Sequence, residues 1–146
     1  DPEMSRGLGD VYKRQALADA GKKVDSSLCL TTPLGIDTYR EEIDTFLSSL
    51  SRMPDAFVCA SDYVACILMQ LLEKRGLRVP EDVAVSGFDN NTEDLLAEHL
   101  TTVQVFNEEL GARLALQILY RIKYPNTPHE ITYLGTNVLY RDSTGD

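Results

Sequence analysis

The sequence contains 146 residues, of which 43% are hydrophobic, so it has the size of one domain and can bury a core. Its 23 acidic and 14 basic residues give a net charge of −9, which disfavours binding to nucleic-acid phosphates and anionic membranes. The cysteines, Cys29, Cys59 and Cys66, form no CxxC pair, and no apolar run approaches the roughly 20 residues of a membrane span. We therefore expect a cytoplasmic protein without a membrane partner.

The first 15 residues, DPEMSRGLGDVYKRQ, show neither a helical nor a strand period, and we expect residues 1–15 to be a non-native or disordered leader. The segment LGDVYKRQ resembles a recurrent artefact at the ends of proteins translated from assembled environmental sequence, which implies a missing N-terminal part. Residues 16–20 then predict the end of a helix that stops at Gly21, and residues 24–30 predict a strand.

A helix is predicted to begin at Thr38, because Thr38 to Glu41 have the pattern of a capping box. Apolar residues then recur at helical spacing and form one stripe: Tyr39, Ile43, Phe46, Leu47 and Leu50. Pro54 ends this pattern. The next residues, 56–60, are continuously apolar, which is typical of a strand buried on both faces of a parallel sheet.

A second helix is predicted from Tyr63 to Arg75 and ends at Gly76. Its inward stripe consists of Val64, Ile67, Leu68, Leu71 and Leu72. A turn at Pro80 follows, and residues 83–88 have the length and apolar character of another strand. The alternation of strands and helices with short loops predicts an α/β fold with a doubly wound, mostly parallel sheet.

The rest of the chain predicts a short helix over residues 91–99, a strand over 100–105 and a third long helix capped by Asn107. The apolar stripe of this helix contains Leu110, Leu114, Ile118 and Leu119. Pro125 and Pro128 end it, and two further strands are expected at residues 131–134 and 138–140.

Motifs for catalysis and for cofactors are absent from the sequence. It has no GxGxxG, GxxxxGK, HExxH or GxSxG, so nucleotide binding, metal-dependent hydrolysis and serine catalysis have no local support. His99 and His129 have no cysteine at ligand spacing, which favours structural or surface roles over a metal site. We expect no enzyme activity, no metal and no cofactor.

Polar side chains follow two of the predicted strands, Ser61 and Asp62 after the first and Asp89, Asn90 and Asn91 after the second. The carboxyl ends of parallel strands meet at one edge of a sheet, where ligands bind. Carboxylates and amides there suit a small polyhydroxylated or heterocyclic ligand. Two structural alternatives stay open: Asp62 can be a helix N-cap, and the second group can be a turn cluster that caps a helix.

Three segments together resemble the LacI/GalR family of bacterial transcription regulators: FVCASDYVACILMQLLEKRGLRVPEDVAVSGFDNN, LTTVQVFNEELGARLALQIL and YLGTNVLYRDST. The resemblance implies an incomplete type I periplasmic-binding-protein-like sensor. Residues 16–100 and 136–146 would form its C-terminal subdomain, and residues 101–135 a remnant of its N-terminal subdomain. The DNA-binding helix-turn-helix of the family is absent, so operator DNA would be bound only through a domain outside this sequence.

The resemblance also implies roles for individual residues. Ser61, Asp62 and Asp89 would bind the effector, a sugar or a nucleobase-like molecule, and we add Asn90 to this ligand site from its place at the same strand end. The family's homodimer contact would fall on Cys66, Met69, Gln70, Glu73 and Leu96, although Cys66 and Met69 can instead complete the core. Two positions depart from the family pattern: residues 31–33 lack the frequent effector-binding Arg, and Val105 replaces a frequent polar contact.

The sequence therefore predicts the effector-sensing part of a LacI/GalR-type regulator. Two alternatives remain. A periplasmic sugar-binding protein of a transport system shares the fold but carries a secretory signal, and a small α/β enzyme is disfavoured by the missing motifs.

Overall fold

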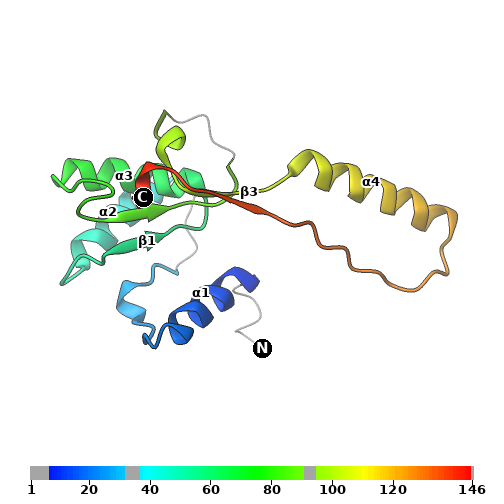
Figure 1. Cartoon of the computed structure of the whole chain (residues 1–146), viewed down its shortest axis with the longest axis horizontal. Coiled ribbons are helices and arrows are strands. Elements are labelled where there is room, and N and C mark those ends of the chain that lie inside the picture. The colour runs from blue at the N-terminus through cyan, green and yellow to red at the C-terminus, as the bar shows by residue number, and fades with distance from the viewer. Residues whose placement is uncertain (1–6, 32–36, 91–94, 146) are drawn as a thin grey trace.

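The computed structural model describes residues 7–31, 37–90 and 95–145. The α-helices are α1 (Gly7–Asp19), α2 (Tyr39–Ser49), α3 (Asp62–Lys74) and α4 (Asn107–Lys123), and the strands are β1 (Ala56–Val58), β2 (Ala84–Ser86), β3 (Thr102–Gln104) and β4 (Asn137–Leu139). Short 3-10 helices are η2 (Ser26–Leu28), η3 (Leu95–His99) and η4 (Asp142–Thr144). Figure 1 shows a lobe built around α2, α3, β1 and β2, from which β3 leads out to α4 and the chain returns through β4.

A parallel sheet forms the centre of the lobe. β1 pairs with β2 in the register Ala56↔Ala84, and single bridges, Ser86↔Thr101 and Asp89↔Gln104, continue the parallel arrangement to the segment of β3. The core lies mainly between β2 and α3. The predicted stripe of α3 is buried at Ile67, Leu68, Leu71 and Leu72, whereas Val64 is only partly buried. This arrangement confirms the predicted α/β class, with strands and helices alternating along the chain.

β1 is less buried than its continuously apolar sequence predicted. Val58 is 61% exposed, and only the flanking Cys59 is buried. Side chains alternate between the two faces of a strand, and the face of β1 that carries Ala56 and Val58 is exposed, whereas Phe57 on the other face is partly buried.

The N-terminal part differs from its prediction in two ways. α1 begins at Gly7 rather than Ala16, so residues 7–15 are helical, and it ends before Gly21, which has a φ of +68°. Residues 24–30 form no strand. The Asp25 carboxylate instead accepts a hydrogen bond from the Ser27 amide over 2.9 Å, and this local bond caps η2 in competition with strand pairing. Residues 1–6 lie outside the described part.

α2 occupies the predicted position and buries Ile43 and Leu47. The predicted capping box between Thr38 and Glu41 is not formed. Thr38 stands at the N-cap position, but its hydroxyl donates to the carboxylate of Glu42 over 2.6 Å rather than pairing reciprocally with Glu41. The helix therefore starts where the pattern indicated, although a different side-chain bond is formed there.

The outlying part of the chain consists of the antiparallel pair β3 and β4 and of α4, which stands away from the lobe (Figure 1). No residue of α4 is buried. Its apolar side chains are solvent-exposed: Leu110, Leu114, Leu116, Ile118, Leu119 and Ile122. Two predictions here are wrong: Phe106 rather than Asn107 is the N-cap residue, and residues 131–134 form no strand, with Tyr133 83% exposed.

Candidate ligand site at the carboxyl ends of β1 and β2

The two polar strand ends meet in the structure, as the parallel arrangement predicted. The Asp62 amide donates to the carbonyl of Phe88 over 2.9 Å, so the start of α3 lies against the end of β2. The Asp89 amide donates to the carbonyl of Val103 over 3.0 Å, which attaches the same turn to β3. The edge therefore brings α3, the β2 turn and the outgoing strand together.

Ser61 is the N-cap of α3. Its hydroxyl oxygen accepts a hydrogen bond from the Val64 amide over 3.4 Å, and its backbone is extended, as at most N-caps. The helix-capping alternative thus applies to Ser61 and not to Asp62. Ser61 remains partly exposed at the strand edge.

Asp62 lies beneath the edge and is only 2% exposed. Its Oδ1 accepts a hydrogen bond of 2.5 Å from the hydroxyl of Thr102, the first residue of β3. Its Oδ2 is buried and has no hydrogen-bond partner among the described residues. A Cβ atom at Gly87 would come within 2.2 Å of Asp62 Oδ1, so only glycine leaves room for this carboxylate.

Asp89 presents a partly exposed carboxylate at the same edge. Partial burial, followed by the negative charge of Asp62, raises the pKa of the Asp89 carboxyl above its ordinary value. Its φ of +104° is rare for a residue with a side chain. A hydrogen-bond donor from a ligand would relieve the cost of ionising this group.

Asn90 is held by two protein side chains. Its Nδ2 donates to Gln104 Oε1 over 2.8 Å, and its Oδ1 accepts from Arg141 Nη2 over 2.9 Å. The structure therefore brings Ser61, Asp62, Asp89 and Asn90 to one edge but gives them different surroundings. Asn91, the last member of the predicted group, lies outside the described residues.

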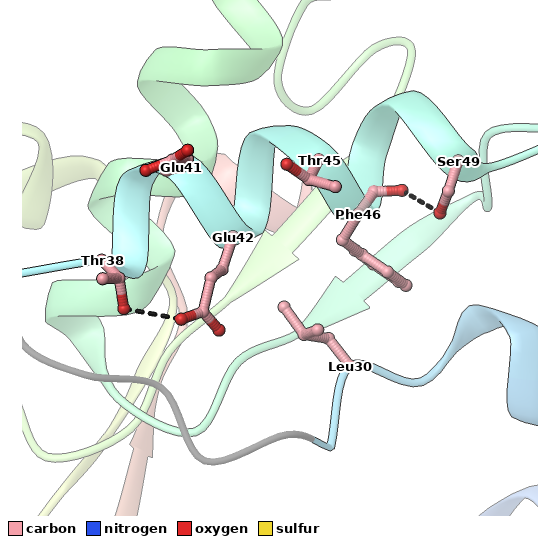
Figure 2. A pocket seen from close by; sticks show the side chains of 7 residues that line it. All are labelled: Leu30, Thr38, Glu41, Glu42, Thr45, Phe46 and Ser49. Carbon is pink, nitrogen blue, oxygen red and sulfur yellow. Dashed lines mark hydrogen bonds between the residues drawn. The ribbon is translucent and has the colours of Figure 1, made fainter.

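A hollow lies elsewhere, between α2 and the segment that contains Leu30 (Figure 2). It is shallow and open, and it is lined by Leu30, Thr38, Glu41, Glu42, Thr45, Phe46 and Ser49. Figure 2 shows the Thr38 hydroxyl turned to Glu42, with Phe46 above Leu30. We favour the strand edge as the site, because it gathers buried and strained polar groups and the hollow does not.

The predicted dimer residues are not equally accessible. Cys66 is 1% exposed and belongs to the core, so its assignment to a surface is wrong within this chain. Met69 and Leu96 are partly buried and pack against the core, whereas Glu73 is exposed. Gln70 accepts a hydrogen bond from Arg40 of α2. The helical spacing could not separate these residues, because α3 is covered on more than one side.

Residues after β4 complete the edge, and the sequence did not identify them individually. Ser143 is buried; its hydroxyl donates to the carbonyl of Val85 over 2.6 Å and accepts from the Thr101 amide over 2.8 Å. Arg141, two residues before Ser143, also donates hydrogen bonds to this part of the lobe. Residue spacing cannot indicate these contacts, because the partners of Ser143 lie 42 and 58 residues away in the sequence.

Metal-binding clusters of three or more His, Cys, Asp or Glu side chains are not found in the described part of the chain. His99 instead pairs with Asp142 at 2.7 Å. Among residues 7–31, 37–90 and 95–145, no helix is long and apolar enough to cross a membrane.

Comparison with known proteins gives a consistent assignment. The periplasmic binding protein-like domain family matches residues 7–144. One curated relative is the regulator GalR of Streptococcus thermophilus, which is 32% identical over 82% of this chain and 37% of its own length. Another is the regulator CelR of Thermobifida fusca, which is 34% identical over 89% of this chain and 38% of its own length. The chain thus spans about two fifths or less of these relatives.

Solved structures agree. A LacI-family regulator from Sanguibacter keddieii has a TM-score of 0.79 at 29% identity, over 91% of this chain and 50% of that one. The CelR–cellobiose complex has a TM-score of 0.76 at 30% identity, and the match covers 89% of this chain and 40% of the CelR chain. These relatives are transcriptional regulators and not enzymes. The chain therefore belongs to the periplasmic binding protein-like domain family, in the form found in transcriptional regulators of the LacI/GalR type.

Proposed function

We propose that this chain senses a small polar effector, most simply a sugar, at the edge formed by Ser61, Asp62, Asp89 and Asn90. The observation that carries the proposal is the partly exposed Asp89 carboxylate, which lies beside the buried Asp62 and has a raised pKa. Hydroxyl groups of a sugar donate strong hydrogen bonds to such a carboxylate. The CelR relative solved with cellobiose and a LacI-family regulator from Enterococcus faecium solved with ribose, 26% identical, support this ligand class.

A nucleobase-like effector fits the same chemistry, because ring N–H groups also donate to carboxylates. A phosphorylated effector fits less well. The two aspartates place negative charge at the edge, and an anion bound there would need additional cationic groups.

Binding would act on DNA through a helix-turn-helix outside this chain. β3 and β4 connect the ligand edge to α4, so a ligand that prefers one arrangement of these strands shifts the equilibrium between two states of the sensor. We place the protein in the cytoplasm, where such a regulator meets DNA. We call the complete protein that contains this chain the full-length regulator.

The ligand assignment can be tested by a thermal-shift screen of the full-length regulator with cellobiose, ribose, adenine and guanosine. Calorimetry then compares Asp89→Ala and Asp89→Asn for the compound that binds. Loss of the charge-assisted hydrogen bonds should cost roughly 1.5–3 kcal/mol of binding free energy, which weakens binding about ten- to hundredfold. Asp37→Ala, at an exposed aspartate of the lobe, is the matched control. Full affinity in Asp89→Asn would remove Asp89 from the ligand contacts.

The 146-residue chain by itself should not bind operator DNA, because its net charge is −9 and its sequence shows no helix-turn-helix pattern. Gel retardation at physiological salt tests this expectation against the full-length regulator. A sequence-specific complex of the 146-residue chain would contradict the proposed division of roles.

We further propose a homodimer contact on α3 and η3, through Met69, Gln70, Glu73 and Leu96. Met69 and Leu96 keep part of their surface exposed, and Glu73, one helical turn after Met69, is exposed as well, so these elements present both apolar and polar groups. Sedimentation of the full-length regulator should show a dimer that becomes a monomer in Met69→Arg. Ser51→Arg, at an exposed position before β1, is the control; an unchanged Met69→Arg dimer would exclude this face.

A further inference from the structure

Asn90 links the two strands that join the lobe to α4. Its amide nitrogen donates to Gln104, the last residue of β3, and its amide oxygen accepts from Arg141, which follows β4 by two residues. Both contacts are partly buried. Both ends of the amide are therefore held by protein groups, which is the environment of a structural side chain more than of a ligand contact.

Arg141 is itself anchored to the lobe. Its Nη1 donates to the carbonyls of Ala97 over 2.8 Å and of Leu100 over 2.9 Å, and its backbone amide donates to the Thr101 hydroxyl over 2.8 Å. A guanidinium fixed at several points offers Asn90 a donor in a defined place.

The Asn90 amide sits at a backbone turn that needs support. Asp89 and Asn90 have φ values of +104° and +49°, in the region that side-chain-bearing residues adopt rarely. Asparagine tolerates this region better than most residues, but aspartate at +104° is unusual. The hydrogen bonds of the Asn90 side chain with Gln104 and Arg141 act directly on this turn and can stabilise its backbone conformation.

We propose that Asn90 is a positioning residue: clamped between Gln104 and Arg141, it keeps the turn that presents the Asp89 carboxylate, so that effector affinity depends on how β3 and the segment after β4 are arranged. This inference rests on the proposed role of Asp89 as a ligand contact. Because coupling is reciprocal, an effector on Asp89 favours the arrangement in which the clamp is closed.

The first test needs no effector. In the full-length regulator, the amides of Gly87 and Asp89, which donate to the carbonyls of Thr101 and Val103, are followed by hydrogen exchange. Gln104→Met, which removes the acceptor at similar size, should speed their exchange about tenfold, as expected for loss of one net hydrogen bond. Gln104→Glu, which keeps an acceptor for Asn90, should restore most of the protection.

Controls separate the clamp from general damage to the strands. Asn137→Ala alters an exposed side-chain amide directly opposite Gln104 in the β3–β4 register. In this variant the backbone amides of Gly87 and Asp89 should exchange at the wild-type rate. Asn90→Gly permits the positive φ without the side chain. If the Gly87 and Asp89 amides exchange at the wild-type rate in Asn90→Gly or in Gln104→Met, the side-chain contacts of Asn90 do not hold the turn, and the proposal is overturned.

The second test measures affinity for whichever of cellobiose, ribose, adenine or guanosine binds the wild type. Gln104→Met should weaken binding about tenfold, and Asn90→Ala combined with it should be no weaker than either single change, because both break one unit. Weakened binding in Asn90→Ala with unchanged binding in Gln104→Met would make Asn90 a direct contact and refute the clamp. If the wild type binds none of these compounds, the proposed effector class fails, while hydrogen exchange still decides the positioning role.

Discussion

The hydroxyl of Thr102 donates a 2.5 Å hydrogen bond to the buried carboxylate of Asp62, 40 residues earlier in the sequence. This bond attaches the first turn of α3 to the strand that leaves the lobe. Because one Asp62 oxygen already has no partner among the described residues, the bond to Thr102 compensates part of the cost of burying the carboxylate.

Removing this donor should destabilise the protein. We expect Thr102→Val to lower the free energy of unfolding by about 1–3 kcal/mol, since a buried carboxylate loses a hydrogen bond at nearly constant side-chain shape. Thr102→Ser keeps the hydroxyl and should lose less. Denaturant unfolding measures both variants, and equal stabilities of Thr102→Val and wild type would show that water satisfies Asp62 instead.

The ionisation of Asp89 predicts a dependence of stability on pH. Its pKa is raised in the folded protein, so the folded state holds the proton more tightly than the unfolded state, and this stabilising effect is lost as pH rises through the raised pKa. Without effector, Asp89→Asn should therefore be more stable than wild type at neutral pH. The difference should disappear as pH falls below the ordinary aspartate pKa of about 3.9.

NMR titration of the Asp89 carboxyl can assign the cause of the shift. Asp62→Asn removes the second contribution, the neighbouring negative charge, so the pKa of Asp89 should fall toward its ordinary value and remain raised by partial burial. An unchanged titration in Asp62→Asn would show that the two carboxyl groups do not interact.

Ser143 should matter more for stability than its place near the end of the chain implies. Ser143→Ala removes the partner of the Val85 carbonyl and of the Thr101 amide, both in the buried centre of the lobe. We expect a loss of about 1–3 kcal/mol on denaturant unfolding. Ser51→Ala, at an exposed serine, should change stability by no more than about 0.5 kcal/mol. Similar small effects of both changes would contradict a stabilising role for the segment after β4.

The apolar surface of α4 predicts that the 146-residue chain binds a hydrophobic dye such as ANS. Leu114→Glu combined with Ile118→Glu should reduce the fluorescence without lowering the melting temperature, because neither side chain is buried. Leu72→Ala in the core is the opposite case: it should cost about 2–5 kcal/mol. If the α4 changes destabilise the chain as Leu72→Ala does, α4 packs against the lobe in solution.

Local patterns in the sequence determined most of the elements. The apolar stripes of α2 and α3, the buried residues around β2 and the stops at Gly21 and Gly76 follow from short-range spacing and from the conformational freedom of glycine. The polar ends of β1 and β2 followed from the same reasoning. So did their meeting at one edge, since parallel strands end on the same side of a sheet.

Tertiary structure alone decided what each polar residue does there. Ser61 caps α3 and Asp62 is buried, although both end the same strand, because Thr102 arrives beside Asp62 and leaves Ser61 at the surface. Asn90 is held by two side chains because Gln104 and Arg141 return to the edge from 14 and 51 residues away, whereas no such pair of contacts holds Asp89 among the residues that the structure describes. Residue spacing reports only neighbours along the chain, whereas these contacts depend on long-range packing that brings distant segments to the same edge.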